Sequence, residues 1–364
     1  MTQKKIILFM PSVEGGGVEK NFFIIANYLA KKLDKVFLIT AEKNLTNKLK
    51  NIQIIYPRSN FWRSEGRLRK YIICIFNLIK ILIRNKDILV FSFQANLYAI
   101  ITCKILNIKI ISRSNSSPSG WSNNFFKKLL YKIGLNLADR LIVNSIEFKN
   151  EMKKKFSVNP IHIYNPLNQK EILSLSKKKV KKVFSKNVLK IISVGRLVDQ
   201  KDQMTLLKAL KSLKEKISFN LIIIGRGINK DKIKNYVHQN KMNKFVKIFY
   251  TNNPFPYVKQ ADLLILSSTF EGLPNVLLEA ITLKKFVISS NCPTGPREIL
   301  DNEKGGFLYD VGEYKSLSKK IVQYVKSKKS LKKKIKYANK RLIRFNYQKN
   351  LNRYLKVVNS LYNR

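Results

Sequence analysis

The first clue to the fold is the stretch Leu263-Leu-Ile-Leu-Ser-Ser-Thr-Phe-Glu-Gly-Leu-Pro-Asn-Val-Leu-Leu-Glu-Ala280. Its first four residues are apolar without polar alternation, which is typical of a parallel strand covered on both faces. Gly272 and Pro274 shape a turn after this strand, and we expect Asn275 to cap a helix that starts near Val276. The stretch therefore predicts a strand, a loop and a helix of an α/β sheet.

The same alternation of short apolar runs and amphipathic segments continues outward in both directions. A first series of predicted strands covers residues 6–10, 36–40, 88–91, 108–112 and 141–144, with helical spacing near 17–33, 67–84, 95–106 and 123–138. A second series covers residues 189–194, 221–225, 246–249, 263–266 and 286–289, again with helices between. Alternating β and α elements in two series predict two doubly wound α/β domains, and 364 residues leave room for both.

A change in composition separates the two series. Residues 177–186 are rich in Lys and have weak apolar patterning. We expect an N-terminal domain over residues 1–168, a linker over 169–187 and a second domain over 188–330. The remaining residues, 331–364, are basic and helical in pattern, and we expect this tail to pack back on the N-terminal domain.

Composition and cysteine usage exclude several classes of protein. An apolar content of 45% excludes a mostly disordered chain. The three cysteines share no metal-ligand spacing and favour a reducing compartment. No segment has the pattern of a signal peptide, and the most apolar stretch, 72–83, is shorter than the ~20 residues that span a bilayer. We expect a cytoplasmic protein without a transmembrane helix.

Glycines follow several predicted strands. Gly15, Gly16 and Gly17 precede the first helix, where glycine lets the backbone approach a ligand and a helix N-terminus favours an anion. Gly195 and Gly225 end two strands of the second series. A tight turn that binds nothing is the alternative interpretation of each loop.

Charged residues at two strand ends are candidates for ligand contacts. Arg196 and Lys201 follow one strand and could converge on a diphosphate, although solvated surface charge is the alternative. Glu271 lies in the loop of the opening stretch and Glu279 in its helix, where both carboxylates could accept hydrogen bonds from sugar or ribose hydroxyls. Compensation of the helix dipole is the alternative for Glu279.

These residues together resemble the retaining glycosyltransferases of family 4. The resemblance rests on Glu271 and Glu279, spaced as Glu-x7-Glu, on Val-Gly-Arg-Leu from Val194 with its following Lys201, and on Tyr164-Asn-Pro. It covers about residues 4–330. The fold it implies is GT-B, in which two Rossmann-like domains face each other across a cleft, here with a helical C-terminal tail.

The resemblance also implies roles for individual residues. Glu271 would bind the transferred sugar, and Arg196 and Lys201 would hold the diphosphate; these three are the expected catalytic residues. Other donor contacts are implied for Glu279, Gly15, Gly16, Gly17, Gly195, Gly225, Gly272, Leu273, Pro274, Asn275 and Val276. Members of the family need no metal or other cofactor, which fits a chain with no Asp-x-Asp among its nine aspartates.

One departure from the family concerns the N-terminal domain. Many members place a histidine near the sugar, whereas neither His162 nor His238 occupies that position. Polar residues at two strand ends are candidates for contacting the donor sugar or the acceptor: Gln94, Asn96, Arg113 and Asn115.

The net charge of +49 points to anionic partners. Only 14 of the 71 basic residues are Arg, and a Lys-dominated excess suits an anionic surface better than the reading of bases. Residues 58–73 and 125–132 mix aromatic and basic residues, which favours peripheral contact with an anionic membrane. Ordinary helices with a solvated Lys face are the alternative, and coding bias could explain part of the Lys content.

Our leading hypothesis is a glycosyltransferase that moves a sugar from a nucleotide-sugar donor to a glycan or lipid-linked saccharide in surface polysaccharide or lipopolysaccharide biosynthesis. The loop 292–297 resembles that of UDP-using members, so we expect a UDP-linked donor and work at the inner face of the cell membrane. A GT-B-fold sugar-nucleotide epimerase is one alternative. A basic nucleic-acid-binding protein is another, but the chain lacks the usual RNA-binding motifs and we expect no nucleic-acid partner.

Overall fold

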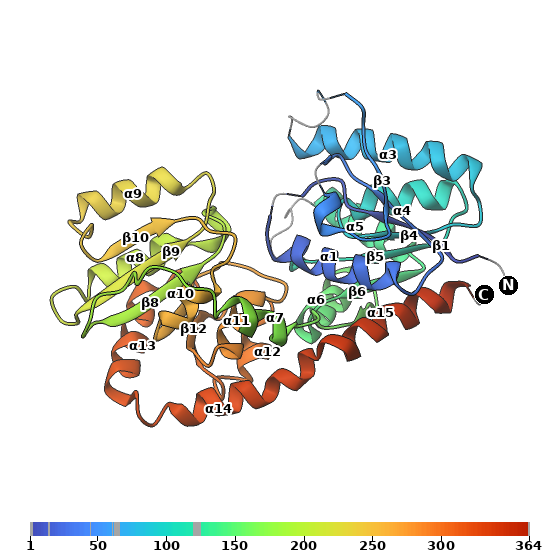
Figure 1. Ribbon diagram of the computed structural model, residues 1–364. Helices are drawn as coiled ribbons and strands as arrows, with labels where there is room; N and C mark the ends of the chain where they lie inside the picture. The colour runs from blue at the N-terminus through green and yellow to red at the C-terminus, as the bar shows by residue number, and fades with distance from the viewer. Residues whose placement is uncertain are drawn as a thin grey trace. The chain divides into compact units, whose positions relative to one another are not determined.

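The chain forms two units, each built around its own parallel sheet (Figure 1). Unit 1 consists of Met1–Pro166 with Gln348–Arg364, and unit 2 of Leu167–Tyr347. This computed structural model describes residues 3–13, 15–43, 45–59, 61, 66–118 and 125–362. Residues 60 and 62–65 of the aromatic and basic segment 58–73 lie outside the described residues.

The sheet of unit 1 has the strand order β3-β2-β1-β4-β5-β6-β7, and all its pairs are parallel. Because the first strand lies in the middle, the chain turns to one side after β1 and to the other after β4. Ligands of such sheets bind at the carboxyl ends of the two strands where the direction changes. The strands are β1 (Lys5–Phe9), β2 (Lys35–Ile39), β3 (Gln53–Ile55), β4 (Leu89–Ser92), β5 (Ile110–Arg113), β6 (Arg140–Val143) and β7 (Ile161–His162).

Helices cover both faces of this sheet because the side chains of each strand alternate between faces. One face packs against α3 (Arg67–Arg84), α4 (Asn96–Ile105), α5 (Phe125–Asn136) and α6 (Ile146–Phe156), in a core that includes Phe9. The other face packs against α1 (Gly17–Ala30) and α15 (Tyr347–Tyr362). The ring of Phe22 on α1 contacts Phe93, and that of Tyr354 on α15 contacts Phe91.

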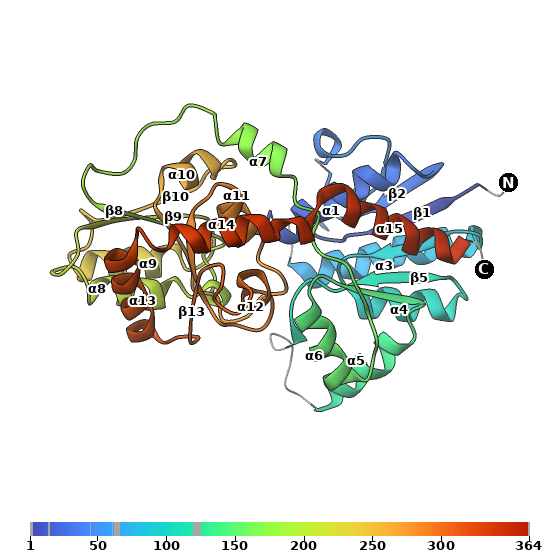
Figure 2. The same cartoon turned by 90° about the horizontal axis from the view of Figure 1, so that it is seen from below.

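The C-terminal tail divides between the units. Helix α14 (Lys332–Arg341) and a 3-10 turn (Leu342–Phe345) belong to unit 2, whereas α15 crosses the strands of unit 1 (Figure 2). Lys4 Nζ donates to Asn359 Oδ1 at 3.1 Å, and Tyr362 donates its hydroxyl to the Lys5 carbonyl at 2.7 Å. Of the tail expected over residues 331–364, only Gln348–Arg364 belongs to unit 1. The part before it stays in unit 2, where Asn339 and Arg344 donate to the carbonyls of Ile281 and Glu298.

Unit 2 repeats the arrangement with six parallel strands in the order β10-β9-β8-β11-β12-β13. Its first strand is again central, so the change of direction lies between β8 and β11. The strands are β8 (Leu189–Val194), β9 (Phe219–Ile224), β10 (Val246–Phe249), β11 (Leu263–Leu266), β12 (Phe286–Ser290) and β13 (Phe307–Tyr309). Strands β3, β7 and β13 were not among the two predicted series, because runs of two or three residues give little apolar signal.

Helices again cover both faces. One face packs against α8 (Gln203–Lys211), α9 (Lys230–Gln239) and α13 (Tyr314–Ser327) around a core that includes Phe219 and Leu317. The other helices of unit 2 are α7 (Gln169–Leu175), α10 (Phe255–Gln260), α11 (Asn275–Thr282), α12 (Pro296–Leu300) and α14. Helix α7 lies inside the segment expected to be a linker, which therefore starts as part of unit 2. Among the described helices, none is long and apolar enough to cross a membrane.

Candidate active site

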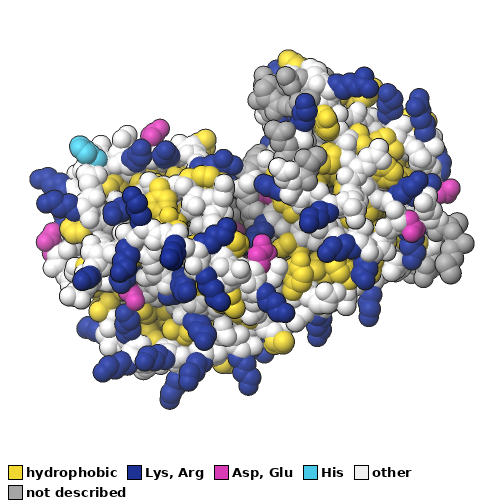
Figure 3. All heavy atoms as spheres, viewed as in Figure 1, with side chains coloured by type: hydrophobic (Ala, Val, Ile, Leu, Met, Phe, Trp, Pro, Cys, Tyr) yellow, Lys and Arg dark blue, Asp and Glu magenta, His cyan; other side chains and the backbone are white. Residues whose placement is uncertain are grey.

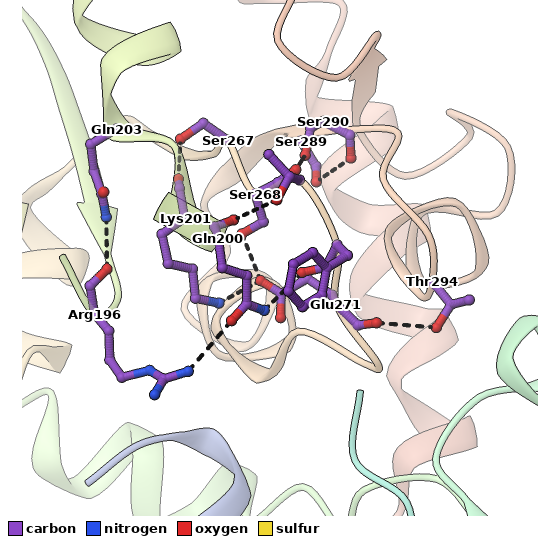
Figure 4. A network of polar contacts seen from close by, with 12 residues as sticks. Arg196, Gln200, Lys201, Gln203, Ser267, Ser268, Glu271, Ser289, Ser290 and Thr294 are labelled. Atoms are coloured by element: carbon purple, nitrogen blue, oxygen red, sulfur yellow. Dashed lines mark hydrogen bonds and ion pairs between the residues drawn. The ribbon is translucent and has the colours of Figure 1, made fainter. Parts of the chain in front are cut away.

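Two loops meet where the sheet of unit 2 changes direction. One follows β8 and ends in a 3-10 turn (Asp199–Lys201), and the other follows β11 (Figure 4). The Thr269 amide donates to the Gln200 carbonyl at 2.8 Å, and Gln200 Nε2 donates to the Phe270 carbonyl at 2.8 Å. Ser267 Oγ donates to the Lys201 carbonyl at 2.8 Å. These bonds hold together residues that are about 70 positions apart in sequence.

The centre of this arrangement is an ion pair between Lys201 and Glu271. Lys201 Nζ contacts Glu271 Oε1, and the side chains are only 17% and 10% exposed. Ser268 Oγ donates to the same oxygen at 2.6 Å. Oε2 of Glu271 has no hydrogen-bond partner among the described residues, so one carboxylate oxygen is fixed and the other remains available to a ligand. Burial of a carboxylate is tolerated here because a cation compensates its charge.

The backbone around Glu271 is held by the loop that follows β12. The Glu271 amide donates to the Pro293 carbonyl at 2.7 Å, and the Thr294 amide donates back to the Glu271 carbonyl at 3.1 Å. Thr294 Oγ1 donates to the Gly272 carbonyl at 2.9 Å. Gly295 has φ +97°, and a Cβ there would lie 2.7 Å from the Gly272 carbonyl oxygen. This glycine is required for the two loops to approach.

Cys292 in the same loop is chemically quiet. Its thiol is buried, and burial together with the nearby Glu271 charge raises the pKa of Cys292 to about 12. A neutral thiol is a poor nucleophile, so this residue contributes packing. Among the described residues, no group of three or more His, Cys, Asp or Glu could hold a metal ion.

Arg196 lies on the same loop as Lys201. Its Nη2 donates to Gln200 Oε1 at 3.4 Å, and its carbonyl accepts from Gln203 Nε2 at 2.9 Å. Asp202, with φ +38°, caps α8 by accepting from the Thr205 amide at 3.1 Å. The cap fixes the end of the loop at Asp202, and the backbone position of the preceding residue, Lys201, is thereby determined by the local sequence.

Of the two predicted glycines Gly195 and Gly225, only Gly225 has a structural reason to be glycine. A Cβ on Gly225 would lie 1.9 Å from the Gly195 carbonyl oxygen. The close approach of these two strand ends therefore explains Gly225 without a ligand, whereas a Cβ on Gly195 would meet only ordinary contacts with the Lys201 side chain.

The expectation that Asn275 caps α11 is wrong. The cap residue is Pro274, which is extended with φ −71° and ψ 101°, and Asn275 is already the first helical residue. Proline fixes its own φ at a value that suits entry into a helix, so the helix starts one residue earlier than predicted. Leu273 is buried, and Val276 and Glu279 lie half-buried on α11.

The corresponding place in unit 1 lies where the loops after β1 and β4 meet. Gly15 has φ +80°, Gly16 is extended at the start of α1, and Gly17 is the first helical residue. Gln94 Oε1 accepts from the Ser12 amide at 2.8 Å, which joins the loop after β1 to the loop after β4. The predicted Gln94 thus lies at the change of direction, in a neutral contact.

Three other predicted residues of unit 1 have structural partners. Arg113 is fully buried and donates to the Tyr354 hydroxyl at 2.9 Å, to Asn165 Oδ1 at 2.7 Å and to Asn115 Oδ1. Asn96 accepts from Ser92 Oγ and donates to the Arg113 carbonyl, both at 3.0 Å. A buried guanidinium with these partners fastens α15 to the sheet, a role that the sequence did not predict.

Sequence reasoning missed the side chains that support Lys201 and Glu271. Ser268, Gln200, Gln203 and Thr294 were not singled out, and neither was the ion pair itself. Three hydroxyl residues, Ser267-Ser-Thr269, directly follow a buried strand, and the middle one lies three positions before Glu271. That run is a signal that could have identified Ser268.

Comparison with known proteins places this geometry in a family. Glycosyltransferase Family 4 matches residues 15–170, and Glycosyl transferases group 1 matches residues 176–341. A Methanocaldococcus jannaschii protein described as an uncharacterized glycosyltransferase is 30% identical over 62% of this chain and 61% of its own length. The N-acetylgalactosamine-N,N'-diacetylbacillosaminyl-diphospho-undecaprenol 4-alpha-N-acetylgalactosaminyltransferase of Campylobacter jejuni is 26% identical over 86% of this chain and 88% of its own.

Solved structures show the same fold. A glycosyltransferase from Rickettsia africae has a TM-score of 0.79 at 19% identity, covering 99% of both chains. Anabaena HepE in complex with UDP has a TM-score of 0.76 at 16% identity, covering 98% of this chain and all of the other. The two parallel sheets, the C-terminal helix and the matches along nearly the whole chain lead to one conclusion: the chain belongs to the family 4-type glycosyltransferases, with the GT-B fold.

Proposed function

We propose that this glycosyltransferase moves a sugar from a UDP-linked donor to a saccharide or lipid-linked saccharide acceptor, with retention of configuration and without a metal. The observation that carries the proposal is the buried Lys201–Glu271 pair, in which one carboxylate oxygen is fixed and the other has no partner among the described residues. The solved complex of HepE with UDP and the named acceptor of the C. jejuni relative support the choice of substrates.

The diphosphate is the part of the donor that needs positive charge. When the bond between sugar C1 and phosphate oxygen breaks, its electron pair goes to the diphosphate. Arg196 and Lys201, on the loop after β8, stabilise this charge electrostatically, which is the role that a metal would otherwise fill. Backbone amides at the start of α11, around Gly272–Val276, add a helix N-terminus.

Glu271 orients the sugar. Lys201 and Ser268 hold its Oε1 in place. The other oxygen, Oε2, is thereby fixed in position and accepts a hydrogen bond from a sugar hydroxyl. Glu279 on α11 binds the ribose. The acceptor oxygen bonds to C1 on the face from which the diphosphate leaves, and the acceptor proton passes to the departing phosphate oxygen. That geometry retains the anomeric configuration.

The acceptor that we propose is a saccharide of surface polysaccharide biosynthesis. Relatives include an amylovoran biosynthesis glycosyltransferase and a lipopolysaccharide 1,6-galactosyltransferase, and the C. jejuni enzyme is named for a diphospho-undecaprenol acceptor. An acceptor of this kind lies in the cytoplasmic leaflet of the membrane, so the enzyme works at the inner face.

The test is transfer from a panel of UDP-sugars to undecaprenyl-diphosphate saccharides, with Glu271→Gln compared with the wild-type protein. Glutamine keeps the shape but loses the charge that holds Lys201, and we expect kcat to fall ~100-fold or more. The matched control is Glu215→Gln, whose side chain is 84% exposed. Equal activity of both variants would refute the site, and no transfer from any UDP-sugar would refute the donor.

Two further readouts test the finer points. The anomeric configuration of the product, read by NMR coupling constants, must match that of the donor. Transfer must also persist in EDTA. Activity that disappears with the chelator and returns with Mg²⁺ contradicts a metal-independent mechanism.

A further inference from the structure

The outer side of α3 carries an apolar stripe. Leu68, Ile72, Phe76 and Ile83 recur at helical spacing and are exposed, with Phe76 63% exposed. They lie on a different side from Cys74, Leu78 and Leu82, which pack into the core of unit 1. The helix is thus apolar both toward the sheet and away from it.

The neighbouring helices extend this stripe. On α4 the exposed positions are Tyr98, Ile101 and Ile105, which share one side of the helix and are all apolar, with Ile105 78% exposed. On α5 the exposed stripe consists of Phe126, Leu130 and Ile133, with Leu129 beside it. We call the exposed apolar residues of α3, α4 and α5 the apolar face.

The three helices lie side by side, so the stripes form one surface. Tyr71 of α3 and Tyr98 of α4 have ring centroids 6.5 Å apart. A Cβ on Gly134 of α5 would lie 2.0 Å from Leu97 Cδ1 of α4, which shows how closely those two helices pack. The apolar face holds more than half of the exposed large apolar side chains of the described residues. Patches of this kind mark interaction sites.

The charged residues of the three helices that carry the apolar face have one sign. The sequences of α3, α4 and α5 contain no Asp or Glu. Lys80 and Arg84 on α3 and Lys128 and Lys132 on α5 are exposed next to the apolar residues. Basic side chains are spread over the whole side of the molecule seen in Figure 3, so charge alone does not select this surface. The combination of basic side chains with exposed apolar stripes distinguishes this surface from the rest of the described surface.

We propose that the apolar face docks on an anionic lipid surface, with its apolar side chains in the headgroup region and its Lys and Arg side chains on lipid phosphates. A second copy of this chain fits less well. A symmetric contact would set the same basic residues against each other, and the three helices offer no acidic residue to compensate them. The inference does not depend on the donor site, which lies in unit 2.

The structure sharpens what the sequence predicted about the membrane. Residues 125–132 and 67–73 belong to the segments expected to lie at an interface, and they lie on α5 and α3 of one helical layer. Helix α4 was not predicted to contact a membrane. Its apolar residues are typical of a buried helix, and only the structure shows which of them are exposed.

The experiment is co-sedimentation of the full chain with vesicles of phosphatidylglycerol or of phosphatidylcholine, at low and high salt. We expect binding to the anionic vesicles that weakens with salt. Phe76→Ser, Ile105→Ser and Ile133→Ser combined should lower the affinity at least ~10-fold. Lys80→Gln, Arg84→Gln and Lys128→Gln combined should lower it ~100-fold at low salt, about fivefold for each cation.

Matched controls come from unit 2. Leu173→Ser, Val325→Ser and Ile343→Ser remove exposed apolar side chains, and Lys230→Gln, Lys232→Gln and Lys234→Gln remove cations from α9. Both triple variants should bind as the wild type does. Equal losses in the unit 2 variants would overturn the proposal, since binding would then follow total charge or hydrophobicity.

Two other outcomes also decide the matter. Absence of binding to anionic vesicles refutes the proposal. A wild-type dimer in light scattering that the apolar variant converts to a monomer, with vesicle binding unchanged, assigns the apolar face to a second copy instead. If a triple variant unfolds, as judged by its urea midpoint, the single substitution Ile105→Ser replaces it.

Discussion

The two units share a topology but differ in the residues placed on it. Each has a parallel sheet whose first strand is central, and in each the loops after two central strands meet. In unit 2 this place holds the buried Lys201–Glu271 ion pair, and in unit 1 the neutral contact of Ser12 with Gln94. The fold supplies the same kind of place twice, and the side chains decide which one suits a charged ligand.

The helices that cover one face of each sheet differ in their exposed side chains, which are mainly polar in unit 2 and include apolar stripes in unit 1. The exposed positions of α8 and α9 are polar or charged throughout, and those of α13 are polar or charged apart from Val325. The equivalent helices of unit 1 expose apolar stripes. Burial against the sheet is needed in both units, so it cannot explain an apolar outer side in only one. The difference separates residues that hold the fold together from residues that meet a partner.

The largest expected effect concerns the charged place in unit 2. Lys201→Met removes the cation proposed to hold the diphosphate and leaves Glu271 buried without its partner, so we expect kcat/KM to fall ~1,000-fold. The exposed Lys208→Met on α8 is the control and should change little. Steady-state transfer assays measure both. Similar activities for the two variants would mean that the ion pair does not distinguish unit 2.

The next effect is on the stability of unit 2. Gly225→Ala places a Cβ 1.9 Å from the Gly195 carbonyl oxygen, which forces the two strand ends apart. We expect a loss of about 3 kcal/mol in the free energy of unfolding. At Gly66 a Cβ would meet nothing within 4 Å, so Gly66→Ala serves as the control. Urea denaturation with hydrogen exchange of both units tests this, and unchanged protection of β8 and β9 contradicts it.

A smaller effect is expected in unit 1. Tyr354→Phe leaves the buried Nε of Arg113 without the acceptor on α15, at a cost of about 1–3 kcal/mol. The control is Tyr250→Phe, because the Tyr250 hydroxyl donates to Asn252 Oδ1 at 2.7 Å and Asn252 is exposed. Hydrogen exchange should show α15 loosening while unit 2 keeps its protection. An equal loss of protection in both units would mean that the Tyr354 hydroxyl does not act on unit 1 alone.

The smallest effect is a pH dependence in unit 1. Burial, with Arg353 nearby, lowers the pKa of His162 from 6.5 to about 4. The unfolded chain therefore binds this proton more readily, and the contribution of His162 to stability is lost as the pH falls from 6.5 toward 4. His162→Gln should flatten the dependence of the urea midpoint on pH across that window. His238→Gln, at an exposed position, should leave it unchanged.

The sequence predicted those features of the fold and the site that depend on local patterns, and missed those that depend on contacts between distant segments. The strands of both sheets, apart from β3, β7 and β13, could be predicted from apolar runs, because burial on two faces leaves a continuous signal. Arg196, Lys201 and Glu271 were identified as strand-end residues with unusual chemistry. Their support by Ser268 and Gln200 was not, since it depends on contacts between two loops that only the sheet brings together.

Arg113 shows the limit most clearly. A polar residue at a strand end reads as a ligand contact, and the sequence alone cannot show that α15 returns over 200 positions later to bury it. The sequence by itself determined the α/β class, the two domains, the family resemblance and the excess of positive charge, because these depend on local patterns and composition. The tertiary structure decided which charges are paired, which polar residues are buried and which apolar stripes face outward. Those properties arise from packing between distant segments.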